Sequence, residues 1–378
     1  MTPPPDARPA KALLDALAAE PRPAGSDAEA RARALCAERL RGLGFAVAER
    51  PFDYSAFPGR YATPLVGLAG VGGIMAAGHV GFRGHPGAAL ALLAAAGIGT
   101  GAFALYCARV GILTLPVMRA RGINLEAVRG VGEPRCWLVA HVDSKSQPPP
   151  IGVRAAGVAA SALVWLVAAV VAVAGVAGAD VAGWWLWLAV AAVVAGAPVV
   201  ASVVGTRSPG ALDNASGVAT VLLAAAAMPG SLPIGVLITS AEELGLAGAR
   251  AWARERAPGV AVNVDGVDDR GAMTAMFSGR RPERLARLAA AAGVRVRRLL
   301  PGILTDAVAL ADAGWETFTV SKGTPRTLAR IHGPRDTADA LDGRGIAESA
   351  RAVAGIAAAI AAEVAREPVV ADGAWQRS

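Results

Sequence analysis

Charged and aromatic residues are scarce in this sequence of 378 residues. Asp, Glu, Lys and Arg together make up 18% of it and Phe, Trp and Tyr 5%, whereas 54% is hydrophobic. A soluble domain of this length carries less apolar content, so we expect part of the chain to lie in a lipid bilayer. The net charge of +7 comes from scattered arginines without interleaved aromatic residues. This pattern does not match a nucleic-acid surface, and we expect no nucleic acid among the partners.

Cysteine is equally scarce. Cys36, Cys107 and Cys136 lie far apart and have no neighbouring histidine. Their spacing excludes a disulfide framework and a zinc knuckle, and it favours a reducing compartment. The proline-rich start, residues 1–9, has no apolar core after a basic stretch. We therefore expect no secretory signal and a start in the cytosol.

Four long apolar runs interrupt the chain. Residues 64–80, 86–107, 155–179 and 181–204 are almost free of charge. At about 1.5 Å per residue, each run crosses or nearly crosses a hydrocarbon core of about 30 Å. They predict two transmembrane hairpins, at 62–108 and 154–206. Buried core helices rich in Ala and Gly are the alternative, and this alternative is stronger for the first hairpin.

The residues that flank these runs predict an orientation. Trp184, Trp185 and Trp187 are typical of a membrane interface. Cations lie near the helix ends on the side of the polar segments, namely Arg60, Arg109, Arg119, Arg121, Lys145, Arg154 and Arg207. The two turns offer only Arg83. Positive residues mark the inner face of a membrane, so we expect the polar segments to face the cytoplasm.

The polar segments alternate between helix and strand patterns. Residues 10–19 and 27–43 have apolar residues at helical spacing, and residues 45–52 resemble a strand. Short apolar strands follow at 136–140, 234–238 and 260–264. This alternation predicts an α/β domain with a mixed central sheet flanked by helices. The hairpins divide it into three pieces, 1–60, 109–153 and 207–378.

Potential metal ligands follow these strands. Taken singly they have ordinary explanations: Asp213 is a plausible helix cap, and the adjacent carboxylates of Glu242 and Glu243 could be a solvated strand end. Taken together, two imidazoles and three carboxylates suit two zinc ions about 3.5–4 Å apart that share one carboxylate. This set is His141, Asp213, Glu243, Asp265 and His332. Glu242 is left over as a base for metal-bound water, and Asp143 could fix the ring of His141.

In chain order, these motifs resemble the co-catalytic zinc aminopeptidases of peptidase family M28. The matching runs are His-x-Asp-Ser at 141–144, Asp-Asn-Ala-Ser-Gly at 213–217, Glu-Glu-x-Gly at 242–245, Asn-x-Asp at 263–265, His-x-Pro-x-Asp-Thr at 332–337 and the Pro-rich opening at 21–26. The resemblance implies the zinc aminopeptidase (phosphorylase/hydrolase-like) fold, a peptide substrate and two Zn²⁺ per chain, with Co²⁺ or Mn²⁺ as substitutes.

The resemblance also implies a role for each residue. His141 and Asp265 would hold one zinc ion, Glu243 and His332 the other, and Asp213 would bridge them. Glu242 would be the general base, and Asp143 would orient His141. N-terminal residues of peptides would then be removed by hydrolysis.

The sequence departs from the family in three places. Tyr54, Tyr61 and Tyr106 all lie upstream of the final histidine loop, so the oxyanion stabiliser stays open. Thr305-Asp306 resembles the Ser-Asp loop of the family, but Ala307 replaces the histidine that is common there. A hairpin separates the motif at 141–144 from the one at 213–217, and a long insertion adds little closure entropy. We expect the active site to open near the membrane surface.

Other functions stay open beside the aminopeptidase. A catalytically inactive receptor or scaffold could keep the fold, although the complete ligand set and the presence of Glu242 argue against it. A transporter would need ionisable residues within the membrane, yet the spans offer only His79, and Asp180 lies at a turn. A carboxypeptidase or an amide-forming cyclase could use the same site, since substrate pockets lie in loops. The oligomeric state is open as well.

Overall fold

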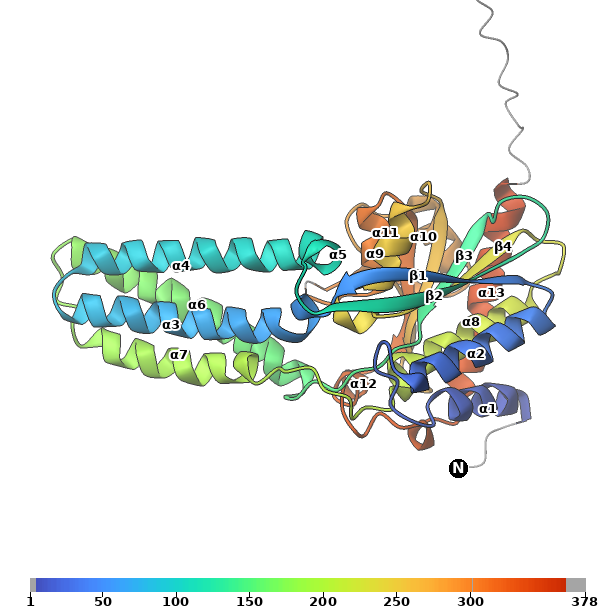
Figure 1. Cartoon of the computed structure of the whole chain (residues 1–378), viewed down its shortest axis with the longest axis horizontal. Helices are drawn as coiled ribbons and strands as arrows, with labels where there is room; N and C mark the ends of the chain where they lie inside the picture. Colours follow the sequence, from blue (N-terminus) through green and yellow to red (C-terminus); the bar gives the residue numbers. More distant parts are fainter. Residues whose placement is uncertain (1–4, 301, 365–378) are drawn as a thin grey trace, which may run out of the picture.

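The protein consists of an α/β body from which a bundle of long apolar helices projects (Figure 1). The computed structural model describes residues 5–300 and 302–364. Residues 1–4 and 365–378, the outer ends of the predicted pieces 1–60 and 207–378, lie outside the described residues.

The body is built on one mixed sheet. Within the described residues it has eight strands in the order β1-β2-β4-β3-β5-β8-β6-β7. The strands are β1 (Ala46–Ser55), β2 (Arg119–Arg129), β3 (Cys136–His141), β4 (Ile234–Thr239), β5 (Val260–Val267), β6 (Ala272–Phe277), β7 (Arg295–Arg298) and β8 (Glu316–Gly323). The four central strands β4, β3, β5 and β8 are parallel to one another, while β1, β2 and β6 form antiparallel pairs. The predicted mixed sheet is confirmed.

Helices cover both faces of this sheet. One face carries α1 (Arg8–Leu17), α2 (Asp27–Gly42), α8 (Ser216–Ala227), α10 (Glu283–Ala291) and α13 (Arg344–Val364), and the other carries α9 (Ala247–Arg254) and α11 (Asp306–Asp312). Strand β3 shows the cause. Leu138 and Ala140 join the larger cluster with α8, while Trp137 and Val139 pack with Trp252 on the opposite face. A strand buried on both faces must be apolar throughout, as β3 is up to its final histidine.

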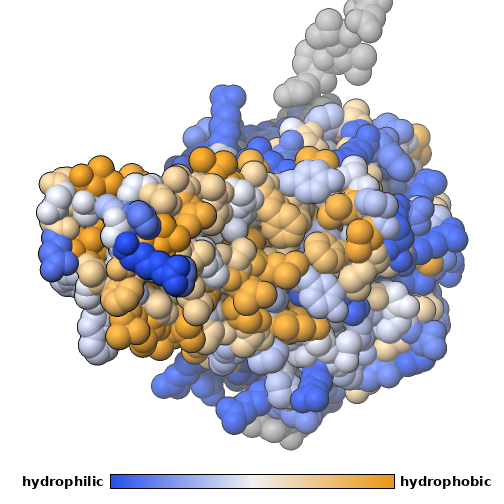
Figure 2. All heavy atoms as spheres, turned by 60° about the vertical axis from the view of Figure 1, so that its left-hand side comes forward, coloured by the Kyte–Doolittle hydropathy of each residue, from blue (hydrophilic) through white to orange (hydrophobic). Residues whose placement is uncertain are grey.

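The projecting bundle contains α3 (Thr63–Phe82), α4 (Pro86–Tyr106), α6 (Ile151–Val176) and α7 (Trp184–Val200). Small and branched side chains such as Ile74, Ala77, Leu93 and Ala168 form its interior. Its outer surface is largely apolar (Figure 2). Three short helices connect the bundle to the body, namely η2 (Pro58–Ala62), η3 (Cys107–Gly111) and α5 (Ile112–Thr114). A further short helix, α12 (Pro325–Leu328), follows β8 in the body.

Three helices of the bundle are long and apolar enough to cross a membrane, namely Pro58–Phe82, Pro86–Thr114 and Ile151–Val176. The fourth, α7, has 17 residues and is shorter than the predicted run 181–204. Helix α13 also meets the length and composition criteria, but 61% of its apolar window is buried against the α/β body. Apolar length alone therefore does not separate the bundle from the core.

One detail of the predicted interfacial belt is wrong. Trp184 and Trp187 are exposed, but Trp185 is only 2% exposed and lies in the bundle interior. Its ring lies against Gly78 and Gly81 of α3, where a Cβ on Gly81 would come within 2.3 Å of the indole. Trp185 therefore holds the two hairpins together.

Candidate metal centre

The candidate ligands gather at one edge of the sheet because the parallel strands end there. Strands β3, β4 and β5 are neighbours with the same direction. His141 ends β3, the turn η5 (Glu242–Leu244) follows β4, and Asp265 lies near the end of β5. Carboxyl ends of parallel strands are the usual ligand edge of such sheets. The chain thus places distant motifs side by side.

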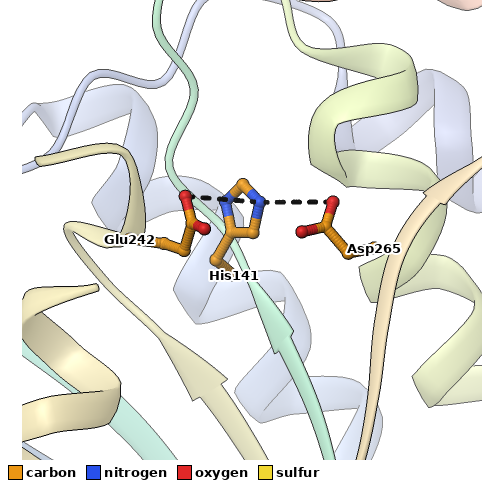
Figure 3. A group of neighbouring side chains, drawn as sticks. All are labelled: His141, Glu242 and Asp265. Atoms are coloured by element: carbon orange, nitrogen blue, oxygen red, sulfur yellow. Dashed lines mark ion pairs between the residues drawn. The ribbon is translucent and has the colours of Figure 1, made fainter. Parts of the chain in front are cut away.

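His141, Glu242 and Asp265 form the first group (Figure 3). The Nε2 atom of His141 lies 3.9 Å from a Glu242 oxygen and 3.8 Å from an Asp265 oxygen. An Asp213 oxygen lies nearer, at 3.2 Å from the same nitrogen. Ligand atoms that share a tetrahedral zinc ion lie roughly 3.3 Å apart, given bonds of about 2 Å.

Asp213, Glu243 and His332 form the second group. The Nε2 atom of His332 lies 3.0 Å from Oδ2 of Asp213 and 3.3 Å from Oε2 of Glu243. Asp213 therefore directs one carboxylate oxygen at each histidine, Oδ1 at His141 and Oδ2 at His332. This is the arrangement that a carboxylate shared by two ions requires.

Unsatisfied buried atoms show that the residues fit metal ions. The Nε2 atom of His141 and the Oε1 atom of Glu243 are buried, and neither has a hydrogen-bond partner among the described residues. A buried polar atom without a partner costs free energy, so such atoms are rare unless a ligand completes them. The donors are also the imidazole and carboxylate types that zinc prefers.

The electrostatics of the site separate its two kinds of carboxyl group. Burial, together with the neighbouring carboxylates of Glu243 and Asp265, raises the pKa of Glu242 well above its usual value. Burial alone would also raise the pKa of Asp213, but the close imidazoles of His141 and His332 outweigh it and hold that pKa well below the usual value. Asp213 is thus an anion between two imidazoles, while Glu242 holds a proton readily.

Asp143 contacts the ring of His141 through its main-chain carbonyl and not, as the sequence suggests, through its carboxylate. Its carboxylate lies 3.7 Å from Nδ1 of His141, and the ring nitrogen instead lies 3.0 Å from the main-chain carbonyl of Asp143. The carboxylate accepts hydrogen bonds from the backbone N–H groups of Glu242 and Glu243, at 3.1 and 3.2 Å. Asp143 therefore positions all three residues, the histidine through its backbone and the glutamates through its carboxylate.

Two further residues hold the ligand-bearing loops. The Asp336 carboxylate accepts hydrogen bonds from the backbone N–H groups of Leu212 and Asp213. The guanidinium of Arg22, 1% exposed, donates to the carbonyls of Val142 and Gly210. Asp336 and Arg22 lie in the sequence motifs at 332–337 and 21–26. Their roles, however, depend on hydrogen bonds to residues more than 100 positions away in the sequence.

The sequence gives Lys145 and Arg154 only as cations that flank the membrane. In the structure Lys145 Nζ lies 2.9 Å from Oε2 of Glu243. Arg154, in the first turn of α6, has a guanidinium nitrogen 3.1 Å from Nδ1 of His332. Thr305-Asp306 also lies near the site, since the Thr239 hydroxyl at the end of β4 donates to the buried Asp306 carboxylate. No local sequence signal distinguishes these cations from solvated ones.

Comparison with known proteins agrees with this fold. The family model described as "Peptidase family M28" matches residues 197–357. An aminopeptidase from Aneurinibacillus sp. strain AM-1 has 13% identity and a TM-score of 0.53, covering 93% of this chain and 92% of that chain. A zinc aminopeptidase from Bacillus subtilis has 15% identity and a TM-score of 0.52, covering 94% and 95%.

A glutaminyl cyclase from Bacteroides thetaiotaomicron is similar to the same extent, with 15% identity and a TM-score of 0.53 over 95% of this chain and 99% of that chain. No curated protein sequence matches the chain. At these identities the solved structures establish the fold, and the predicted aminopeptidase-like fold is confirmed.

Proposed function

Because the model of peptidase family M28 matches residues 197–357, we propose that the chain is a zinc-dependent aminopeptidase of this family that removes N-terminal residues from peptides. One observation carries the proposal: the Asp213 carboxylate lies between the imidazoles of His141 and His332, with a further carboxylate on each side. Two ions, each with an imidazole and carboxylates, fit this arrangement, and Co²⁺ or Mn²⁺ could substitute for zinc.

Each residue then has a definite task. His141 and Asp265 would hold one ion, Glu243 and His332 the other, and Asp213 would serve both. Ions bound there would polarise the peptide carbonyl and lower the pKa of a water molecule. Glu242 would accept the proton of that water and pass it to the leaving amine. Glu242 is 6% exposed, so bulk water does not compete for the proton.

We also propose that the bundle spans the bilayer and that the peptidase body lies on the cytoplasmic side. Exposed apolar side chains such as Leu163, Leu166, Leu186 and Val194, each more than 60% exposed, cover its outer surface. A soluble protein rarely exposes so large an apolar surface. The polar segments 1–60, 109–153 and 207–378 then form one domain, and the hairpins 62–108 and 154–206 anchor it.

A second function has support from the comparisons. Solved structures named glutaminyl cyclases resemble this chain as closely as the aminopeptidases do. Cyclisation of an N-terminal glutamine releases ammonia without water, so it needs no water-activating base. A carboxylate such as Glu242 could carry a proton from the attacking amine to the leaving ammonia in that reaction as well. The two ligand groups, which suit two ions acting on one water molecule, favour hydrolysis.

The test uses the full chain, purified in detergent and loaded with zinc. We expect it to release arylamine from aminoacyl-arylamides, and a chelator should stop the release. Glu242→Gln should keep its zinc and lose at least a hundredfold in kcat, because general base catalysis contributes about 10²–10⁴-fold. Ammonia release from N-terminal glutaminyl peptides without arylamide hydrolysis would identify a cyclase instead. Zinc-loaded protein with neither activity would favour an inactive receptor or scaffold.

A further inference from the structure

A small pocket opens beside the metal centre at the junction with the bundle. Its cavity volume is about 20 Å³, and its lining includes Glu243, Asp143, Lys145, Arg60 and Thr206. Glu243 belongs to the second ligand group, so this pocket adjoins the position of a reacting peptide bond. We name it the Arg60 pocket.

The first hairpin supplies one wall of the Arg60 pocket. Its base, η2, lies against the turn that carries the glutamates, because a Cβ on Gly59 would come within 2.5 Å of Cα of Leu244. At the other end of the hairpin, Ile112 lies against Gly245, where a Cβ would come within 2.5 Å of its side chain. Arg60 follows Gly59 directly, so this backbone contact fixes its place at the pocket.

The second hairpin supplies the opposite wall. After α7 the chain returns to the site, and Gly205 exchanges two backbone hydrogen bonds with Ser146, at 2.7 and 3.0 Å. The segment 204–206 therefore lies beside Lys145. Both hairpins contribute directly to the surroundings of the metal centre, in addition to any anchoring role.

Two cations, Arg60 and Lys145, and two carboxylates, Asp143 and Glu243, line the pocket. The Asp143 carboxylate accepts hydrogen bonds from the backbone N–H groups of Glu242 and Glu243. Lys145 has Glu243 as its ion-pair partner, and Glu243 Oε2 also lies 3.3 Å from His332. If Glu243 binds a metal ion, the ion shares the negative charge of Glu243, and the charge of Lys145 is then only partly neutralised. Arg60 forms no ion pair with any of the described residues, and its buried Nε atom has no hydrogen-bond partner among them. Arg154, in contrast, already contacts Gln147 and His332.

We propose that the Arg60 pocket binds a carboxylate of the peptide substrate through Arg60 and Lys145. The inference rests on the peptide-hydrolase function proposed above. A guanidinium matches a carboxylate with two parallel hydrogen bonds, and an ammonium 17% exposed gains from a counter-ion more than an exposed one does. The carboxylate is either an acidic side chain of the substrate or its free C-terminus. The substrates are thus acidic peptides or very short ones.

Binding to the zinc-loaded Glu242→Gln variant, measured by calorimetry in detergent, tests this without turnover. Two matched pairs separate the two sources of carboxylate: Glu-Ala-amide against Gln-Ala-amide, and Ala-Ala against Ala-Ala-amide. We expect the carboxylate member of at least one pair to bind ten times more tightly or better. Equal binding within both pairs would overturn the proposal.

Variants then locate the preference. Adding Arg60→Gln should remove the tenfold difference in dissociation constant between the members of a pair, and Arg60→Lys should keep part of it. Arg83→Gln, in the distant hairpin turn, should leave this difference unchanged. A ratio that survives Arg60→Gln in a protein with the normal melting temperature would contradict the assignment. Arg60-dependent binding of a short-chain phosphatidate, without discrimination in either peptide pair, would assign the pocket to a lipid headgroup instead.

These outcomes are independent of the proposed hydrolysis. If the wild-type chain hydrolyses neutral arylamides but both peptide pairs bind equally, the aminopeptidase stands and the carboxylate pocket falls. If the Glu242→Gln variant prefers carboxylates and the wild-type chain hydrolyses nothing, the pocket stands and the hydrolase falls.

Discussion

Gly59 allows the first hairpin to approach the turn η5, which carries Glu242 and Glu243, and Gly59→Ala tests how closely the two are coupled. The added Cβ would lie 2.5 Å from Cα and 2.7 Å from both C and O of Leu244, so no side-chain rotation can relieve the overlap. An ordinary van der Waals contact begins at 3.4 Å, which requires a shift of about 0.9 Å. Overpacking of this kind typically costs about 1–3 kcal/mol.

The shift acts on Glu242 and Glu243, which precede Leu244 in η5. A misplacement of about 1 Å can lower a rate by about a hundredfold. We therefore expect Gly59→Ala to lower kcat/KM for an aminoacyl-arylamide by roughly ten- to a hundredfold. The assay compares it with Gly72→Ala in the same hairpin, because a Cβ on Gly72 meets nothing within 4 Å.

Gly72→Ala should leave the rate unchanged and raise helix stability by as much as about 1 kcal/mol. If Gly59→Ala keeps the wild-type rate while remaining folded, η5 is not coupled to the hairpin as the structure indicates. Equal losses in both variants would point to a general effect on the bundle and would also refute the reasoning.

Two further predictions concern stability. Trp252 packs between Trp137 and Trp315, with ring centroids 4.8 and 4.9 Å away, so Trp252→Ala should cost about 3–5 kcal/mol in chemical denaturation and Trp252→Phe clearly less. An equal loss in both would mean that ring packing is not the cause. Burial raises the pKa of Glu29 to about 7 from 4.5, so the native state binds this proton more tightly than the unfolded state does. Ionising the buried Glu29 therefore lowers the free energy of unfolding. This destabilisation is absent below about pH 4.5, grows as the pH rises, and is complete above about pH 7, at about 3 kcal/mol. Glu29→Gln should flatten this part of the stability profile of the metal-free protein, whereas the exposed Glu38→Gln in the same helix should not; an unchanged profile for Glu29→Gln would exclude Glu29 as the source.

The sequence predicts the ligand edge because strand patterns are local and because parallel strands end at the same edge of a sheet. Each motif follows a strand or precedes a helix, and parallel neighbours bring their carboxyl ends together. His141, Glu242 and Asp265 meet for this reason. The alternation of helix and strand likewise predicts the mixed sheet, which the structure confirms.

Contacts between distant segments escape sequence analysis. Nothing near Asp143 indicates that its backbone carbonyl, and not its carboxylate, contacts His141. Arg60 and Lys145 have the pattern of ordinary cations at a membrane. Only tertiary contacts place them beside the candidate metal centre, for Arg60 the packing of Gly59 on Leu244 and for Lys145 its ion pair with Glu243. The length of the apolar run also predicts the wrong end for α7. The helix ends at Val200, and the backbone carbonyl of Ser202 accepts a hydrogen bond from the Gln147 side chain.

The zinc content of the purified chain tests the central claim most directly. Mass spectrometry of the detergent-purified wild type and of Glu242→Gln should give close to two zinc ions per chain, because the proposal makes Glu242 the base and not a required ligand. Asp213→Asn should lose both ions or retain one weakly, since its carboxylate serves both groups. A folded wild-type chain without metal, or an Asp213→Asn variant that keeps two ions, would contradict the shared centre.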